Sequence, residues 1–576
     1  MDFGKLARPL TVGAVIVLLG CSAPPSSSSQ TSASQPAPRP AAEKRLVTAI
    51  FGDPKNLGTN RTSPGGALQN VPGGEAVEEL LQVGLSTIDE KGALQARLAE
   101  AVPSFENGLW KVTPDGHMET TWKIKENARW HDGAAFTSDD LLFTAQVYQD
   151  KDTGIFPNTN IDLIQRVEAP DRRTITVTWS QPFIEADSLF TAVLALPMPK
   201  HLLEKAFAED KTRVMEQPYW TDDFVGTGAY KLRAWAPGSH VALEAFDGYT
   251  MGRPKIDQVE IKFIYDANAL IASVASGVVD LTMGRGLDIE QALSVPKQRT
   301  DVEPVYASAG WVPIYPQFLN TTPAIVGDAR MRRALLHAID RQELADTVAH
   351  GLVPVAHTFV SPEEAMYKGV ESSIVKYDYD PRRSTQLIDE LGYSRGSDGM
   401  YRDTTNQPLS IELWTTAQRD HHLKSIFPVA DNWQRVGVAV EANVVPIQRV
   451  PDREYLFQFP AFILIGLGNG LRSADVKRYH STFAGTAENR YQLSGNMARY
   501  ANADFDTLID KYITTIPMPE RTKVLADIVR QQTDQVTVMG LFYQLRPVIR
   551  AQKLLNITAG HQTGSPAWNA HTWDVR

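Results

Sequence analysis

Short stretches of the chain alternate apolar and polar residues with the period of a β-strand. Residues 174–179, which read TITVTW, and residues 259–264, which read VEIKFI, show this alternation. Residues 46–51 read LVTAIF and predict a buried strand, because almost every position is apolar. The pattern therefore predicts strands that are separated by long intervals of other structure.

Capping residues mark the starts of helices between and after these strands. Thr137 precedes the stretch SDDL at 138–141, which comes close to a capping box. Residues 380–392 predict a helix with an aspartate cap, a proline in its first position and a glycine at its end. Asp328 predicts a further helix that continues toward Gly351. Strands and helices alternate irregularly and no solenoid repeat is visible, so the chain is expected to form α/β lobes.

The N-terminus has the pattern of an export signal. Lys5 and Arg8 precede an apolar run over residues 10–19, which is too short to cross a bilayer core of about 30 Å. The run ends in Leu-Leu-Gly before Cys21, and this sequence resembles the bacterial lipobox, in which the cysteine carries the lipid. Residues 1–20 are therefore expected to be a lipoprotein signal peptide. Residues 21–44, rich in Ser, Pro and Ala, are expected to be a disordered tether.

Composition narrows the class of protein without identifying it. The 576 residues include 43% apolar and 22% charged residues, which is ordinary for a globular chain, and this length predicts two or three packed units. The formal net charge is −10 and no long basic run occurs, so a nucleic-acid partner is not expected. Cys21 is the only cysteine, which leaves the exported body without a thiol to mis-pair in an oxidising compartment.

Several motifs follow one another in a recognisable order. Residues 122–141 read WKIKENARWHDGAAFTSDDL, in which Asp-Gly at 132–133 predicts a tight turn with positive φ. Residues 226–232 read GTGAYKL, residues 277–280 read GVVD, and residues 330–341 read RMRRALLHAIDR. The stretches YDP at 379–381, YANADFD at 500–506, LFY at 541–543 and WNAH at 568–571 complete the series.

Together these motifs resemble family 5 of the extracellular solute-binding proteins, which includes the oligopeptide, dipeptide and nickel receptors of ABC importers. The resemblance extends over nearly all of residues 46–576, although Ala229 stands where the family commonly has proline. It implies a receptor that captures a solute and delivers it to the permease subunits, and the lipobox-like sequence at Cys21 places this receptor on the periplasmic or cell-surface side with a lipid anchor in the membrane. It further implies a monomer that needs no cofactor and is not an enzyme.

The resemblance also implies a division of the chain into parts. The expected fold is α/β, a type II periplasmic-binding-protein fold whose two lobes close on the ligand about a hinge. The expected limits are residues 45–70, 198–308 and 541–576 for lobe I, 71–197 for an extra subdomain of lobe I, and 309–540 for lobe II.

The ligand site is expected in the cleft between the lobes. Oligopeptide receptors of the family usually carry a tryptophan followed by an acid on a loop of lobe II, and the acid pairs with the ligand's ammonium group. The corresponding loop here, residues 462–472, has neither residue. We therefore expect a peptide-like or other polar organic solute held by hydrogen bonds and aromatic stacking. The candidate contacts are Trp311, Tyr315, Trp414, Asn469 and Arg472, although each aromatic residue suits core packing equally well.

Other interpretations have weaker support in the sequence. Residues 466–471 read GLGNGL, which lacks the third glycine of a dinucleotide loop. His421 and His422 are adjacent and do not share a helix face, so a dedicated metal site is not expected. A secreted hydrolase would need a motif such as G-x-S-x-G, which does not occur. A cell-surface adhesion or chaperone-like protein on the same scaffold remains open.

Overall fold

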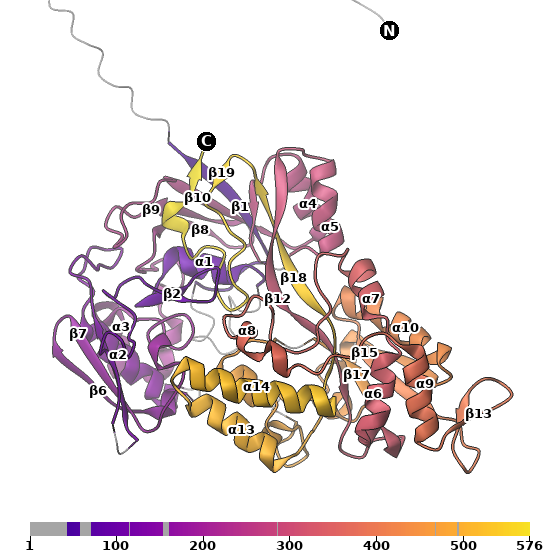
Figure 1. Cartoon of the computed structure of the whole chain (residues 1–576). Coiled ribbons are helices and arrows are strands. Elements are labelled where there is room, and N and C mark those ends of the chain that lie inside the picture. The colour runs from indigo at the N-terminus through magenta and orange to yellow at the C-terminus, as the bar shows by residue number, and fades with distance from the viewer. Residues whose placement is uncertain are drawn as a thin grey trace, which may run out of the picture. The chain divides into compact units, whose positions relative to one another are not determined.

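A long mixed sheet runs through the protein, and several helices pack against its strands (Figure 1). The computed structural model describes residues 43–57, 71–113, 116–153, 160–284, 286–466, 468–491 and 495–576. The predicted signal peptide, Cys21 and almost all of the predicted tether therefore lie outside the described residues. Residues 43–576 form one compact unit.

The main sheet has ten strands in the order β16-β15-β17-β12-β18-β11-β1-β10-β9-β8. Two of its strands, β12 and β18, are long and antiparallel, and they connect the two ends of the sheet. Figure 1 shows this pair side by side near the middle of the molecule. The ten strands are β1 (Arg45–Phe51), β8 (Tyr230–Ala236), β9 (His240–Ala245), β10 (Gln258–Ile264), β11 (Leu281–Thr282), β12 (Val302–Pro316), β15 (Ser410–Thr416), β16 (Ala439–Val445), β17 (Phe462–Leu464) and β18 (Met539–Ala551).

Smaller sheets lie outside the main one. A four-stranded antiparallel sheet in the order β4-β5-β7-β6 is built from the part of the chain between β3 and α3. Its strands are β4 (Trp110–Val112), β5 (Met118–Lys123), β6 (Ile164–Asp171) and β7 (Thr174–Trp179). The two-stranded sheets pair β2 (Ser86–Ile88) with β3 (Leu94–Ala96), β13 (Ser394–Arg395) with β14 (Tyr401–Arg402), and β19 (Leu554–Leu555) with β20 (Asp574–Val575).

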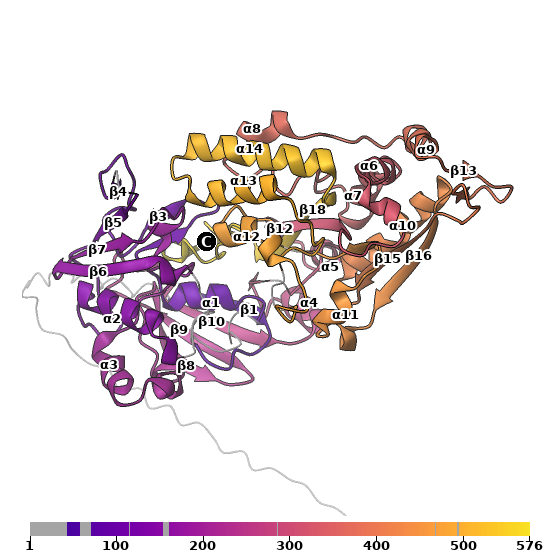
Figure 2. The same ribbon diagram turned by 90° about the horizontal axis from the view of Figure 1, so that it is seen from below.

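The helices cover the sheets, and α13 and α14 pack side by side in both views (Figures 1 and 2). Their bounds are α1 (Gly74–Leu81), α2 (Ser138–Gln149), α3 (Lys200–Glu209), α4 (Ala267–Ala275), α5 (Ile289–Ser294), α6 (Ala329–His337), α7 (Arg341–Val348), α8 (Tyr367–Val370), α9 (Pro381–Glu390), α10 (Asp420–Arg435), α11 (Arg453–Phe457), α12 (Ser473–Lys477), α13 (Ala503–Thr514) and α14 (Met518–Gln535). Within the described part of the chain, no helix combines the length and the apolar character that a membrane crossing requires.

The three predicted strands are confirmed as β1, β10 and β7, the last with its predicted limits. The capping box at α2 is confirmed as well, because the Thr137 main-chain N–H donates to the Asp140 carboxylate at 2.9 Å. Gly133 has a φ of +93°, as the tight turn requires.

The single helix expected after Asp328 is instead two helices, α6 and α7. The helical structure is interrupted between them because Asp340 is the N-cap of α7: its side chain accepts from the Glu343 N–H at 2.9 Å.

Candidate functional site

The short helix α1 forms one wall of a large polar cavity. Apolar residues at 76, 77, 80 and 81 are fully buried, while glutamates at 75, 78 and 79 line the cavity on another face of the helix. Residues spaced by three and four positions lie on one face of a helix, so this pattern separates core contacts from cavity contacts. Gly73, just before the helix, has a φ of +100°, and a Cβ there would lie 2.6 Å from the Met283 carbonyl oxygen. The helix can therefore begin this close to the sheet only with glycine at that position.

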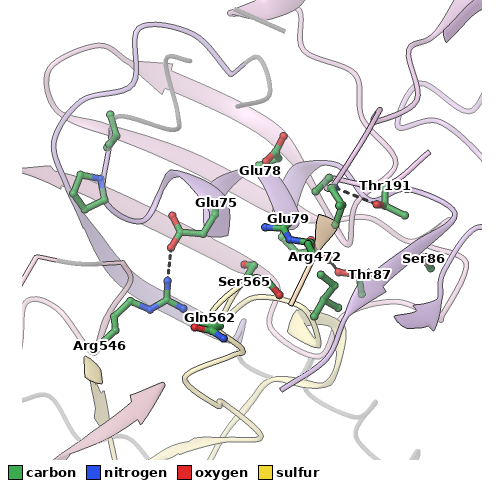
Figure 3. Close-up of a pocket in the computed structure, with 18 of the residues that line it drawn as sticks. Glu75, Glu78, Glu79, Ser86, Thr87, Thr191, Arg472, Arg546, Gln562 and Ser565 are labelled. Carbon is green, nitrogen blue, oxygen red and sulfur yellow. Dashed lines mark hydrogen bonds and ion pairs between the residues drawn. The ribbon is translucent and has the colours of Figure 1, made fainter. Parts of the chain in front are cut away.

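This main cavity has a volume of about 790 Å³ and is lined by segments that are far apart in the sequence. Its lining includes residues 86–88 of β2, residues 191–193, residues 418–419, and residues 562–565 near the C-terminus (Figure 3). The charged residues of the lining are Glu75, Glu78, Glu79, Arg419, Arg472 and Arg546. A cavity of this size with both signs of charge is suited to a polar solute of several functional groups.

The charged pair Glu75–Arg546 fixes α1 against the central strand β18. Glu75 Oε1 accepts a hydrogen bond from Arg546 Nη1 at 3.0 Å, and Figure 3 shows the two side chains pointing toward one another. The Arg546 side chain is 4% exposed, and Arg546 Nη2 donates to the Ala559 carbonyl oxygen. The pair therefore joins α1, β18 and the C-terminal segment at the cavity wall.

Polar groups beside α1 are held in a defined geometry. Glu79 accepts a hydrogen bond from the Thr87 hydroxyl at 2.6 Å, and burial raises the pKa of Glu79 above its usual value. The Ser86 hydroxyl is buried and has no hydrogen-bond partner among the described residues. A buried hydroxyl without a partner costs free energy, so Ser86 adds an unsatisfied polar group to the wall of the cavity that it lines.

A side cavity of about 330 Å³ adjoins the main cavity and shares Gln418, Arg419 and Arg546 with it. Its lining includes the apolar residues Phe51, Leu287, Phe542 and Leu545 and the imidazole of His421. Burial lowers the pKa of His421 to about 4, so its ring is neutral at physiological pH. The two cavities together offer a polar compartment next to a more apolar one.

Of the five ligand contacts expected from the sequence, the structure places Arg472 in the lining of the main cavity. The other four are buried and belong to the lining of neither cavity. Trp311 packs on Gly540, Trp414 donates to the Glu412 carboxylate at 2.8 Å, Asn469 donates to the Phe359 carbonyl oxygen at 2.8 Å, and Tyr315 is 1% exposed in β12. Their role in ligand binding stays a prediction.

The glutamates of α1 and the C-terminal residues 562–565 were not expected to border the site. The one-face spacing of residues 75, 78 and 79 is visible in the sequence, but an exposed helix face has the same spacing. Residues 562–565 read QTGS, which has the composition of an ordinary loop.

The histidine pair occupies structural positions. His422 Nε2 accepts from the Gly466 main-chain N–H at 2.9 Å, and His421 is hydrogen-bonded to the Gln544 side chain. Among the described residues, no three His, Cys, Asp or Glu side chains gather as a metal ion would require.

Comparison with known proteins places the chain in a family. Residues 95–489 match the family described as bacterial extracellular solute-binding proteins, family 5, and the chain belongs to it. The oligopeptide-binding protein AppA of Bacillus subtilis is 25% identical over 433 residues, which are 75% of this chain and 74% of AppA. A putative ABC transporter peptide-binding protein of Brucella ovis is 27% identical over 302 residues, 52% of this chain and 53% of that protein.

Solved structures show the same fold. The structure of AppA from Bacillus subtilis in complex with a nonapeptide superposes with a TM-score of 0.66 at 21% identity, covering 93% of this chain and 99% of AppA. NikZ from Campylobacter jejuni in complex with Ni(L-His) superposes with a TM-score of 0.69 at 20% identity, covering 92% of this chain and 99% of NikZ. The predicted α/β, two-lobed periplasmic-binding-protein fold is therefore confirmed.

Proposed function

We propose that this protein is the solute receptor of an ABC importer and that it holds a peptide-like or other polar organic solute in the main cavity. The observation that carries the proposal is the cavity itself. It brings three glutamates, three arginines and the buried Ser86 hydroxyl around one space of about 790 Å³. Family membership and the names of the relatives, which include oligopeptide-binding and peptide-binding proteins, support the same class of ligand.

In this proposal, the lobes close on the solute about β12 and β18, and the permease recognises the closed form. The backbone has features that suit a hinge in this pair of strands, whose register shifts between Ser308 and Gly310 and again between Val312 and Pro313. Arg472 is proposed as a direct ligand contact, because its guanidinium group lines the cavity and is suited to a carboxylate or a carbonyl group.

We further propose that the protein is exported as a lipoprotein and anchored through Cys21. The support is the short apolar run over residues 10–19, which is followed by Gly20 and then by the only cysteine of the chain. An anchored receptor stays close to the permease that it serves, and residues 22–44 have the composition of a flexible tether.

The test begins with mass spectrometry of the small molecules released when the purified protein is denatured. A released solute is then titrated back calorimetrically into wild-type protein, the Arg472→Glu variant and the Arg330→Glu variant. Arg330 is the matched control, because it lies on α6 and its side chain is 56% exposed. Loss of affinity of at least about tenfold in Arg472→Glu alone supports the proposal, since a charged hydrogen bond contributes about 1.5–3 kcal/mol. Equal affinity in all three proteins contradicts it.

A further inference from the structure

Beside the main cavity, a buried carboxylate joins two parts of the chain that lie 288 residues apart. Glu185 Oε1 accepts from the Ser473 main-chain N–H at 3.0 Å, and Glu185 Oε2 accepts from the Ser473 hydroxyl at 3.0 Å. Glu185 is 7% exposed and Ser473 is 1% exposed. Glu185 belongs to the segment 71–197, expected to be the extra subdomain, whereas Ser473 belongs to the segment 309–540, expected to be lobe II.

The position of Ser473 in helix α12 leaves its main-chain N–H in need of an acceptor outside the helix. Ser473 is the first residue of α12, and the first N–H groups of a helix have no acceptor within the helix. Arg472, which occupies the cap position, makes no side-chain capping hydrogen bond. A buried N–H without an acceptor costs about 1–3 kcal/mol, so Glu185 supplies the acceptor that the packed arrangement of these two segments requires.

The contact lies next to the cavity wall. Arg472 immediately precedes Ser473, and its Nε lies 3.7 Å from Asp475 Oδ2. The Tyr512 hydroxyl, which belongs to the same segment 309–540 as Arg472, donates to the Leu471 carbonyl oxygen at 2.7 Å. The backbone that carries Arg472 is therefore held on one side by Tyr512 and on the other by Glu185.

A second contact of the same kind borders the cavity. The Gln562 side chain, which lines the cavity, donates to Glu364 Oε1 at 2.7 Å. Glu364 belongs to the segment 309–540 and Gln562 to the segment 541–576. Hydrogen bonds therefore cross between different segments of the chain at two places on the rim of one cavity.

We infer that Glu185 is a positioning residue for solute binding: by holding Ser473, it fastens the two segments together and fixes the Arg472 guanidinium group at the cavity wall. The inference rests on the proposed function for the identity of the site. Separation of the segments hydrates the carboxylate and leaves the Ser473 N–H without Glu185 as its acceptor, so the contact favours the arrangement in which the two segments are packed together.

Hydrogen–deuterium exchange of the purified full chain tests this inference, with the Ser473 amide as the reporter. In the Glu185→Ala variant this amide is expected to exchange at least about tenfold faster, because it loses the acceptor that Glu185 provides. Protection of the amides in the central strand β12 should stay unchanged. X-ray scattering of the same variant should show a larger radius of gyration than the wild-type protein.

The Ser473→Ala variant removes only the hydroxyl donor and provides a second, milder test. Its radius of gyration should also be larger than that of the wild-type protein. Glu204→Gln is the matched control, since Glu204 is an exposed carboxylate in helix α3. Unchanged exchange at Ser473, or faster exchange spread evenly over the whole chain, overturns the inference. A wild-type protein that releases no solute on denaturation contradicts the proposed function but leaves the exchange result to decide the role of Glu185.

Discussion

Glu75 Oε1 and Arg546 Nη1 lie 3.0 Å apart, and this ion pair connects a cavity-lining helix to the long strand β18. The Arg546 side chain is almost fully buried, whereas Glu75 is 27% exposed. Removal of one partner from a buried pair leaves the other charge poorly solvated, and the cost exceeds the net contribution of the intact pair.

We therefore predict that Glu75→Gln lowers the free energy of unfolding by about 2–3 kcal/mol, somewhat below the usual range because Glu75 is partly exposed. Replacing both partners, in Glu75→Gln with Arg546→Met, should recover part of that loss. Urea unfolding of the two variants and of the Glu204→Gln control checks this prediction. Purely additive losses in the double variant would contradict it.

The acid Asp187 should make stability depend on pH. Burial, and then the neighbouring Glu185 carboxylate, raise the pKa of Asp187 to about 7. The folded protein then binds the Asp187 proton more tightly than the unfolded chain does, for which the value is about 3.9. The stabilising contribution is therefore fully present below about pH 4 and is lost as the pH rises through about 7.

The Asp187→Asn variant should gain stability relative to the wild-type protein between pH 5 and pH 8, by about 1–2 kcal/mol. Denaturant midpoints at several pH values measure this difference. Asp152→Asn is the control, because the Asp152 side chain is 85% exposed, and it should show no such trend. A relative gain for Asp187→Asn toward low pH would contradict the assignment.

Close packing between β18 and the loop after α7 depends on Gly540. A Cβ at this position would lie 2.3 Å from the Ala356 carbonyl oxygen and 2.8 Å from Cζ3 of Trp311. Gly540→Ala is therefore expected to destabilise the fold by about 1–3 kcal/mol through overpacking. Gly327→Ala, whose new methyl group would meet nothing closer than 4.0 Å, should change stability by less than about 0.5 kcal/mol. Thermal unfolding of both variants compares the two sites.

Anchoring through the lipobox-like cysteine predicts a change of location. The Cys21→Ala variant should appear in the soluble extracytoplasmic fraction, because a protein without its acyl chains loses its membrane affinity. Fractionation with antibody detection of both forms measures the distribution. A variant that stays with the membrane would show that another part of the chain holds it there.

Much of the fold can be predicted from the sequence because local signals agree with the final structure. The strands at 46–51, 174–179 and 259–264 follow from periodicity, and the caps of α2 and α9 follow from residue type. The break between α6 and α7 is harder to predict, since Asp340 competes with an apolar pattern that continues beyond it.

The cavity is harder to predict than the elements that surround it. Arg472 lies on a loop that the family motifs mark as a cleft loop, so its position can be anticipated. Glu79, Thr191 and Ser565 come together only through tertiary packing, and no local pattern connects them. Aromatic residues such as Trp311 are ambiguous for the same reason, because a strand carries them equally well into a core or into a cleft.

The central claim is that a solute occupies the main cavity, and a variant that fills this space tests it most directly. Ala192 is exposed and lines the cavity, so Ala192→Trp should fill part of the space without disturbing a hydrogen bond of its own side chain. Ala234→Trp is the matched control, because Ala234 is an exposed residue of β8 outside the cavity lining. Native mass spectrometry of wild-type protein and both variants would measure the retained small molecule. We predict a bound species in the wild-type protein and in Ala234→Trp that is lost in Ala192→Trp, whereas equal retention in all three would contradict the claim.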